Sequence, residues 1–175
     1  MDALAEIRRD LRESGAVRFG TFTLASGQTS DVYVDVKRAW TAPVRLRRIA
    51  AALAERCRGA DALAGMELGA VPLVVATALQ TGQPFVVIRK AAKAHGTQRR
   101  YEGDLAPGSR VVLIEDVTTT GGSVAESIGI LRSAEGLVEK VVTVVDREQG
   151  ARERLAALGV PLESLTTLSE LRGSR

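Results

Sequence analysis

The sequence predicts an α/β fold in which a mostly parallel central sheet is flanked by helices. Short apolar runs rich in β-branched residues have the length of buried strands, and these are Ala62–Met66, Phe85–Arg89, Val111–Glu115 and Val138–Asp146. Stretches with helical spacing separate or follow them, at about residues 71–81, 122–135 and 149–157. Alternating strands and helices are typical of a parallel sheet covered on both faces. Such sheets bind ligands at the carboxyl ends of their strands.

The residues at the start of the chain do not follow this alternation. Residues 2–14 have the apolar spacing of a helix. Residues 17–24 and 32–36 are expected to form the strands of a hairpin. Pro43 suits the first turn of a further helix, which carries Cys57 on its apolar face. We therefore expect Cys57 to be an inert core residue.

Composition and charge exclude several classes of protein. Of the 175 residues, 45% are hydrophobic and 26% are charged, which is typical of a globular chain, and the length suits a single domain, residues 1–175. No apolar run is long enough to span a membrane, and the first residues lack the apolar core of a secretory signal. A single cysteine excludes a disulfide framework, so we expect a cytoplasmic protein. The net charge of +3 is too small to indicate nucleic-acid binding.

The strongest functional motif spans residues 111–123. An apolar strand ends in two adjacent acids, Glu115 and Asp116, and a loop of small residues then leads into a helix. The free N–H groups of such a loop and the positive end of the helix dipole suit a phosphate group. The motif is neither a Walker A loop nor a dinucleotide-binding loop, because the glycine spacing and the lysine that these need are absent. The predicted phosphate loop consists of Val117, Thr118, Thr119, Thr120, Gly121, Gly122 and Ser123.

The two acids need a role of their own, because carboxylates beside a phosphate would repel it. Accepting hydrogen bonds from sugar hydroxyls is such a role. The motif therefore predicts a site for a ribose 5-phosphate group. The alternative is an ordinary strand, turn and helix in which threonine and serine cap the helix, but this leaves the paired acids unexplained.

Residues 89–108 form a long polar stretch, which in a compact domain is typical of a functional or disordered loop. A short β-excursion is expected near residues 98–102. Five positive charges fall within twelve residues, with the only histidine among them, and these residues are Arg89, Lys90, Lys93, His95, Arg99 and Arg100. A flexible cationic loop can close over a polyanion and stabilise charge on a leaving group. The alternatives are a solvated face or a nucleic-acid patch, but Tyr101 is the only aromatic residue nearby.

Two further cations follow predicted strands. Arg147 could bind a carboxylate with two hydrogen bonds, and the alternative is a surface arginine paired with Glu148 or Glu153. Lys37 follows the second hairpin strand and could face the same anion. In the loop after the predicted strand Ala62–Met66, Gly69 would allow another group to come close to the backbone. This last signal is weak, because a glycine before a helix is usually part of a turn.

These motifs together resemble those of the type I phosphoribosyltransferase family. Ile114–Ser123 resembles the family's signature for phosphoribosyl diphosphate. Three further segments resemble parts of its orotate-specific members, namely the N-terminal hood (Phe22–Gly27, with Ser30 and Tyr33), the mobile catalytic loop (Arg89–Gly96) and the stretch with the base-binding arginine (Asp146–Glu148). The family often has a lysine where this chain has Ala25, so we expect Lys37 to take over part of that role.

The resemblance implies a type I phosphoribosyltransferase fold with a small hood, built mainly from residues 1–40, and a mobile catalytic loop at about residues 90–106. It implies transfer of ribose 5-phosphate from phosphoribosyl diphosphate to N1 of orotate. Mg²⁺ would be held mainly by substrate and water. The implied assembly is a homodimer that shares the loop across subunits, and no nucleic acid or membrane partner is expected.

The resemblance also assigns roles to residues. The implied catalytic residues are Lys93, His95 and Asp116. The implied orotate-binding residues are Thr119, Arg147 and Lys37. The donor would be bound by Arg89, Lys90, Lys93, His95, Glu115 and Asp116 together with the phosphate loop, residues 117–123.

Other functions stay open on the sequence. The enzyme could use a purine or uracil, which Arg147 argues against because these bases carry no carboxylate. The chain could instead be a regulator that senses phosphoribosyl diphosphate and binds nucleic acid. Lys93 and His95, and the lack of an added DNA-binding domain, disfavour that function. An inactive structural subunit finds no support, because every expected catalytic position is filled.

Overall fold

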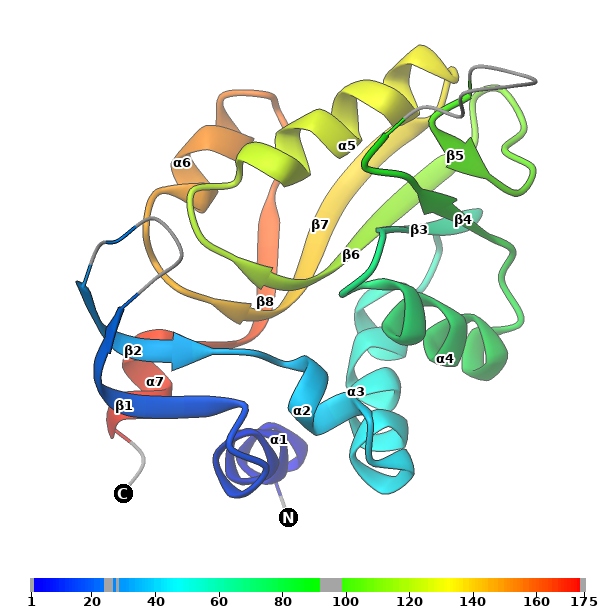
Figure 1. Ribbon diagram of the computed structural model, residues 1–175. Helices are drawn as coiled ribbons and strands as arrows, with labels where there is room; N and C mark the ends of the chain where they lie inside the picture. Colours follow the sequence, from blue (N-terminus) through cyan, green and yellow to red (C-terminus); the bar gives the residue numbers. More distant parts are fainter. Residues whose placement is uncertain (1, 24–26, 28, 92–98, 174–175) are drawn as a thin grey trace.

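The computed structural model describes residues 2–23, 27, 29–91 and 99–173. Within these residues a six-stranded sheet lies at the centre, in the order β5–β4–β3–β6–β7–β8 (Figure 1). Its strands are β3 (Ala62–Met66), β4 (Phe85–Ile88), β5 (Tyr101–Glu102), β6 (Arg110–Thr118), β7 (Leu137–Asp146) and β8 (Leu162–Thr167). Neighbouring strands are parallel except β4 and β5, which are antiparallel. The predicted mostly parallel sheet is confirmed.

Helices cover both faces of this sheet (Figure 1). One face carries α1 (Ala3–Glu13), α3 (Pro43–Arg56) and α4 (Val71–Thr81), and the other carries α5 (Gly122–Ser133) and α6 (Ala151–Ala156). Ile114 of β6 belongs to the core under the first set of helices, and the adjacent Leu113 belongs to the core under the second. Successive side chains of a strand point to opposite faces. A strand covered on both faces therefore appears in the sequence as a continuous apolar run.

The N-terminal hairpin forms a second sheet, in which β1 (Val17–Thr23) pairs antiparallel with β2 (Thr29–Val34). In Figure 1 the hairpin lies on the side of the central sheet toward which the arrows of β6 and β7 point. The final helix, α7 (Leu168–Gly173), braces it, because Arg172 donates a hydrogen bond to Asp31 of β2 (2.5 Å). The hairpin is therefore held near the carboxyl ends of the parallel strands.

The structure differs from the predicted elements in several places. β2 starts at Thr29 rather than at residue 32, because polar residues there pair with β1. The predicted helix at 149–157 is shorter, since Gly150 adopts a left-handed conformation (φ 95°) and the helix begins at Ala151. Three elements were not predicted, namely α2 (Lys37–Trp40), β8 and α7. β8 is a sheet-edge strand with several polar residues, so it lacks the apolar run that marks the inner strands.

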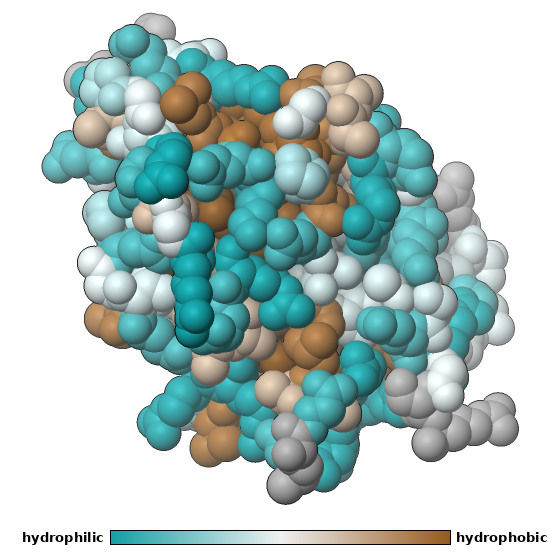
Figure 2. All heavy atoms as spheres, turned by 180° about the vertical axis from the view of Figure 1, so that it is seen from behind, coloured by the Kyte–Doolittle hydropathy of each residue, from teal (hydrophilic) through white to brown (hydrophobic). Residues whose placement is uncertain are grey.

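Cys57 lies in the core, as the sequence predicts. Its side chain is fully buried, and burial raises the pKa of its thiol to about 12, which disfavours the reactive thiolate. In the described part of the chain, no helix combines the length and apolar character needed to cross a bilayer. On the face in Figure 2, hydrophobic residues gather in separate patches divided by hydrophilic ones.

Candidate active site

The two predicted acids lie at the carboxyl end of β6, in the wall of a cavity of about 410 Å³. The ends of β3 and β6, the segments that follow β3 and β4, and the first residues of α2 and α5 meet at this cavity. Of the predicted site residues it brings together Lys37, Lys90, Glu115, Asp116, Val117 and Ser123. These residues come from segments far apart in the chain, and the parallel sheet brings them to one edge.

Burial and the neighbouring Asp116 make a negative charge on Glu115 unfavourable. Glu115 is only 8% exposed, and its carboxylate accepts the N–H of Asp116 (3.0 Å). The Asp116 carboxylate in turn accepts the N–H of Val117 (2.8 Å). Burial, and then the neighbouring Asp116 carboxylate, raise the pKa of Glu115 well above its ordinary value, while the ammonium of Lys90 opposes this shift. Hydrogen-bond donors such as sugar hydroxyls would stabilise the ionised pair.

The predicted phosphate loop is only partly a loop, because β6 continues past its predicted end at Glu115 to Thr118, where it is still paired with β7. Residues 119–121 join β6 to α5, which begins at Gly122. The hydroxyl of Thr118 is buried and donates to the Asp146 carboxylate (3.3 Å), so this side chain turns away from the cavity. Gly121 has a φ of 75°, and a Cβ there would lie 3.1 Å from the Cα of Ala151. Both the backbone conformation and the available space therefore favour glycine. Within the described residues, the cavity wall includes Ser123 but not Thr119, Thr120 or Gly122.

The loop after β3 contributes more than the sequence indicated. Glu67 and Gly69 both line the cavity. The Glu67 carboxylate accepts the main-chain N–H of Lys90 (2.8 Å). A Cβ on Gly69 would lie 2.2 Å from Oδ2 of Asp116, so this loop packs directly against the predicted catalytic carboxylate. The glycine was a visible signal, but the sequence could not show which side chain it approaches.

The structure separates neighbouring cations that the sequence treats alike. Lys90 lines the cavity, whereas Arg89 donates to Glu102 of β5 (3.1 Å) and is absent from the described cavity wall. Arg100 forms an ion pair with Glu126 of α5 (2.6 Å). Lys93 and His95 lie outside the described residues, so their catalytic roles stay predictions.

The two predicted base-binding cations differ in their contacts. The ammonium of Lys37 bonds Asp35 (2.8 Å), and this bond, together with the negative charge of Asp116, raises the pKa of Lys37. Arg147 follows β7, and its main-chain N–H donates to the carbonyl of Thr118 (2.9 Å). The buried Nε of Arg147 has no hydrogen-bond partner in the described part of the protein. No ion pair of Arg147 with Glu148 or Glu153 occurs among the described residues, in contrast to the alternative considered above.

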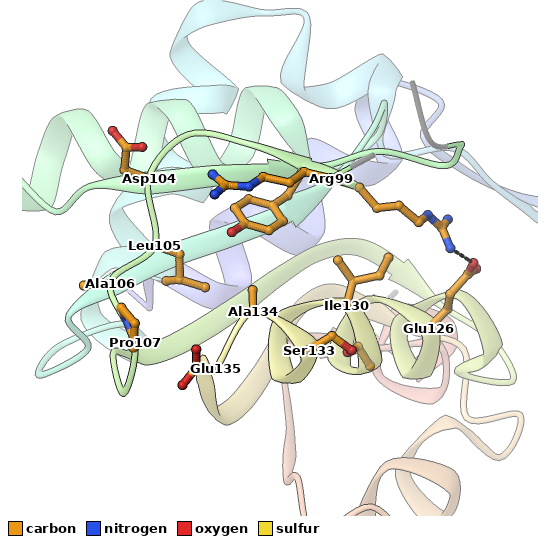
Figure 3. A pocket seen from close by; sticks show the side chains of 13 residues that line it. Arg99, Asp104, Leu105, Ala106, Pro107, Glu126, Ile130, Ser133, Ala134 and Glu135 are labelled. Carbon is orange, nitrogen blue, oxygen red and sulfur yellow. Dashed lines mark hydrogen bonds and ion pairs between the residues drawn. The ribbon is translucent and has the colours of Figure 1, made fainter. Parts of the chain in front are cut away.

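A larger cavity of about 1090 Å³ lies between residues 99–107 and α5 (Figure 3). Its wall mixes apolar side chains such as Leu105 and Ile130 with charged ones such as Asp104 and Glu135. Arg99 and Arg100 of the predicted cationic loop are in its described wall, but none of the residues assigned a catalytic or substrate-binding role is. We therefore assign the candidate active site to the smaller cavity, which holds the acidic pair.

Known proteins resemble this chain over nearly its whole length. Residues 41–160 match the family of the phosphoribosyl transferase domain. Orotate phosphoribosyltransferase of Methanosarcina acetivorans is 47% identical over 168 residues, which cover 95% of this chain and 90% of that protein. The crystal structure of Mycobacterium tuberculosis H37Rv orotate phosphoribosyltransferase in complex with Fe(III) dicitrate has a TM-score of 0.85 and 36% identity, covering 97% of this chain and 98% of that one. The structure of that organism's enzyme in complex with 5-phospho-α-D-ribosyl 1-diphosphate has a TM-score of 0.81 and 31% identity, with 97% and 99% coverage.

Proposed function

Because this chain belongs to the orotate phosphoribosyltransferase family, we propose that it transfers ribose 5-phosphate from phosphoribosyl diphosphate to N1 of orotate. The products would be orotidine 5′-monophosphate and diphosphate, a step of pyrimidine biosynthesis. The observation that carries the proposal is the cavity at the end of β6, which Glu115, Asp116, Lys90 and Ser123 border together. These groups suit the hydroxyls and anionic groups of the donor. The M. tuberculosis relative was solved in complex with this same donor.

The acidic pair would hold the ribose ring. Glu115 and Asp116 would accept hydrogen bonds from the 2′- and 3′-hydroxyls. Breaking the bond between C1 and the diphosphate oxygen leaves positive charge on the ring, and nearby carboxylates stabilise that charge. The 5-phosphate would lie against residues 117–123, where main-chain N–H groups and the amino end of α5 favour an anion.

Cations would stabilise the departing diphosphate. Lys90 borders the cavity and can approach that group. We propose the same role for Arg89, Lys93 and His95, with Lys93 or His95 protonating the leaving group. Closure of these residues over the donor would also exclude water, which would otherwise hydrolyse it.

Mg²⁺ is compatible with the residues of this site. Glu115 and Asp116 offer the carboxylate oxygens that this ion accepts. Among the described residues no group of three or more His, Cys, Asp and Glu side chains is arranged to hold a metal. Because Mg²⁺ keeps several of its waters in protein sites, we propose that most of its ligands come from the diphosphate and from water. When bound, Mg²⁺ neutralises negative charge on the leaving diphosphate.

Arg147 would recognise the carboxylate of orotate, with Thr119 and Lys37 as further contacts to the base. Support comes from the buried Nε of Arg147, which lacks an acceptor within the described residues. Arginine matches a carboxylate with two parallel hydrogen bonds. Uracil and adenine have no such group, so this contact would select orotate.

The proposed assembly is a homodimer in the cytoplasm, in which the loop at about residues 90–106 reaches the partner's site. Lys93→Ala and Asp116→Asn proteins should then restore activity to each other when their subunits are mixed and exchanged. Exchanged mixtures without recovered activity would contradict sharing of the loop.

The proposed reaction can be tested through the ultraviolet absorbance of orotate. Phosphoribosyl diphosphate and Mg²⁺ are added, with uracil and adenine in parallel and with a chelator as a control. Consumption of orotate alone, and only with the metal, is expected. Arg147→Ala should raise the KM for orotate far more than that for the donor. Consumption of another base would refute the assignment of Arg147, and donor binding without turnover would favour a regulator.

A further inference from the structure

Arg100 forms several hydrogen bonds with the main chain of Arg89 and Lys90. Its Nη2 donates to the carbonyl of Lys90 (2.6 Å) and to that of Arg89 (3.3 Å). Its own carbonyl accepts the N–H of Arg89 (2.9 Å). Its Nη1 donates to Glu126 of α5 (2.6 Å), the contact marked by the dashed line at Glu126 in Figure 3. One side chain thus connects the end of β4 to the helix that follows the phosphate loop.

Lys90 is also held from the loop after β3. Its N–H donates to the Glu67 carboxylate (2.8 Å), and the N–H of Glu67 donates to the carbonyl of Ile88 (2.8 Å). Both main-chain polar groups of Lys90 therefore have partners, the N–H in Glu67 and the carbonyl in Arg100. The Lys90 side chain extends from this fixed peptide into the wall of the cavity that contains Asp116. Fixing the peptide reduces the conformational freedom that binding would otherwise have to remove.

We propose that Arg100, anchored by Glu126, is a positioning residue that fixes Lys90 for the diphosphate of the donor. The inference rests on the proposed function, which assigns that diphosphate to Lys90. Arginine suits this task better than lysine, because its planar fork can reach two carbonyls and a carboxylate at once. In the sequence Arg100 is one of several loop cations, and only the structure separates it from them.

The exposure of the ion pair distinguishes positioning from a general structural role. The Glu126 side chain is 52% exposed and that of Arg100 is 28% exposed. Ion pairs this close to solvent contribute little to folding stability. Loss of Arg100 should therefore affect donor binding more than it affects the melting temperature.

The test compares Arg100→Ala with Arg132→Ala. Arg132 is a matched control, because it also donates to a main-chain carbonyl, that of Leu158 (2.9 Å), but lies at the opposite end of α5 from the phosphate loop. Arg100→Ala should raise the KM for phosphoribosyl diphosphate about fivefold to tenfold, the effect of losing one or two hydrogen bonds. The KM for orotate and the melting temperature should change no more than in the control. Arg100→Lys should recover part of the loss, and Glu126→Gln should cause a smaller one.

Amide hydrogen exchange at Lys90 provides a readout that needs no activity. Exchange at this amide should be faster in Arg100→Ala than in the control, with α5 unchanged. The inference would be overturned if the KM of Arg100→Ala for the donor stayed within about twofold of wild type and exchange at the Lys90 amide were unchanged. Equal rises in both KM values with a lower melting temperature would also overturn it, since they indicate a structural role. If wild type does not consume orotate, the proposed function fails, and exchange at Lys90 with calorimetric donor binding still decides the role of Arg100.

Discussion

Replacing Gly69 by alanine should disable the site while leaving the fold intact. The added Cβ would lie 2.2 Å from Oδ2 of Asp116, 2.6 Å from its Cγ and 2.9 Å from its Oδ1. Ordinary van der Waals contact begins near 3.4 Å, so the carboxylate must move by 3.4 minus 2.2, about 1.2 Å. The alanine itself needs no left-handed backbone, because Gly69 is not among the positive-φ residues. The clash therefore displaces a side-chain tip and not the chain.

A displacement of this size is large for a catalytic group. Misplacing reacting groups by about 1 Å can reduce a rate about 100-fold, which corresponds to about 2.7 kcal/mol of transition-state stabilisation. Gly69→Ala should therefore lose about 100-fold in kcat/KM for phosphoribosyl diphosphate in the absorbance assay. The melting temperature should stay close to that of wild type.

Gly129→Ala is the matched control for this substitution. A Cβ at Gly129 meets no atom within 4 Å, and the residue lies inside α5. The control should keep full activity and gain up to about 1 kcal/mol of stability, because alanine favours a helix more than glycine does. The reasoning would be refuted if Gly69→Ala kept a kcat/KM within about threefold of wild type. It would also be refuted if the loss of activity came with a lower melting temperature, because unfolding would then explain the loss.

Substitutions at three further positions test other parts of the structure. Because the pKa of Glu115 is raised in the fold, the ionised carboxylate lowers stability as pH rises above its ordinary pKa of 4.5. Glu115→Gln should therefore raise the melting temperature at about pH 8 but not at about pH 4. Equal gains in melting temperature at both pH values would contradict this. Asp10 of α1 is 5% exposed and forms an ion pair with Arg48 of α3. Asp10→Asn should therefore lower the free energy of unfolding, measured in urea, by about 1.5–3 kcal/mol. A negligible change would show that this ion pair does not stabilise the fold. Glu148, the residue after Arg147, accepts the N–H (2.8 Å) and the hydroxyl (2.9 Å) of Ser169 with its carboxylate. If these bonds help to hold Arg147 in place, both Glu148→Ala and Glu148→Gly should raise the KM for orotate and leave that for the donor unchanged. A normal KM for orotate in both variants would show that Glu148 does not support Arg147.

The central sheet was predictable because its inner strands are covered on both faces. β3 occupies the same residues, Ala62–Met66, that the apolar pattern indicated. The position of the acidic pair was predictable for a related reason, since the apolar run of β6 gives way to carboxylates two residues before the strand ends at Thr118. Polar edge elements such as β8 and α7 carry no comparable pattern. Their position depends on pairing with β7 and on contacts with the hairpin.

Local hydrophobic pattern was thus enough for the α/β class and for the types of side chain at the strand ends. It could not tell which of these side chains share a cavity. The register of β3 on β6 pairs Gly65 with Ile114, and Gly69 in the following loop then packs against Asp116. The pairing of β4 with β5 turns Arg89 toward Glu102, while Lys90 borders the cavity with Asp116. Such choices depend on contacts between residues far apart in the chain, and local periodicity does not specify them.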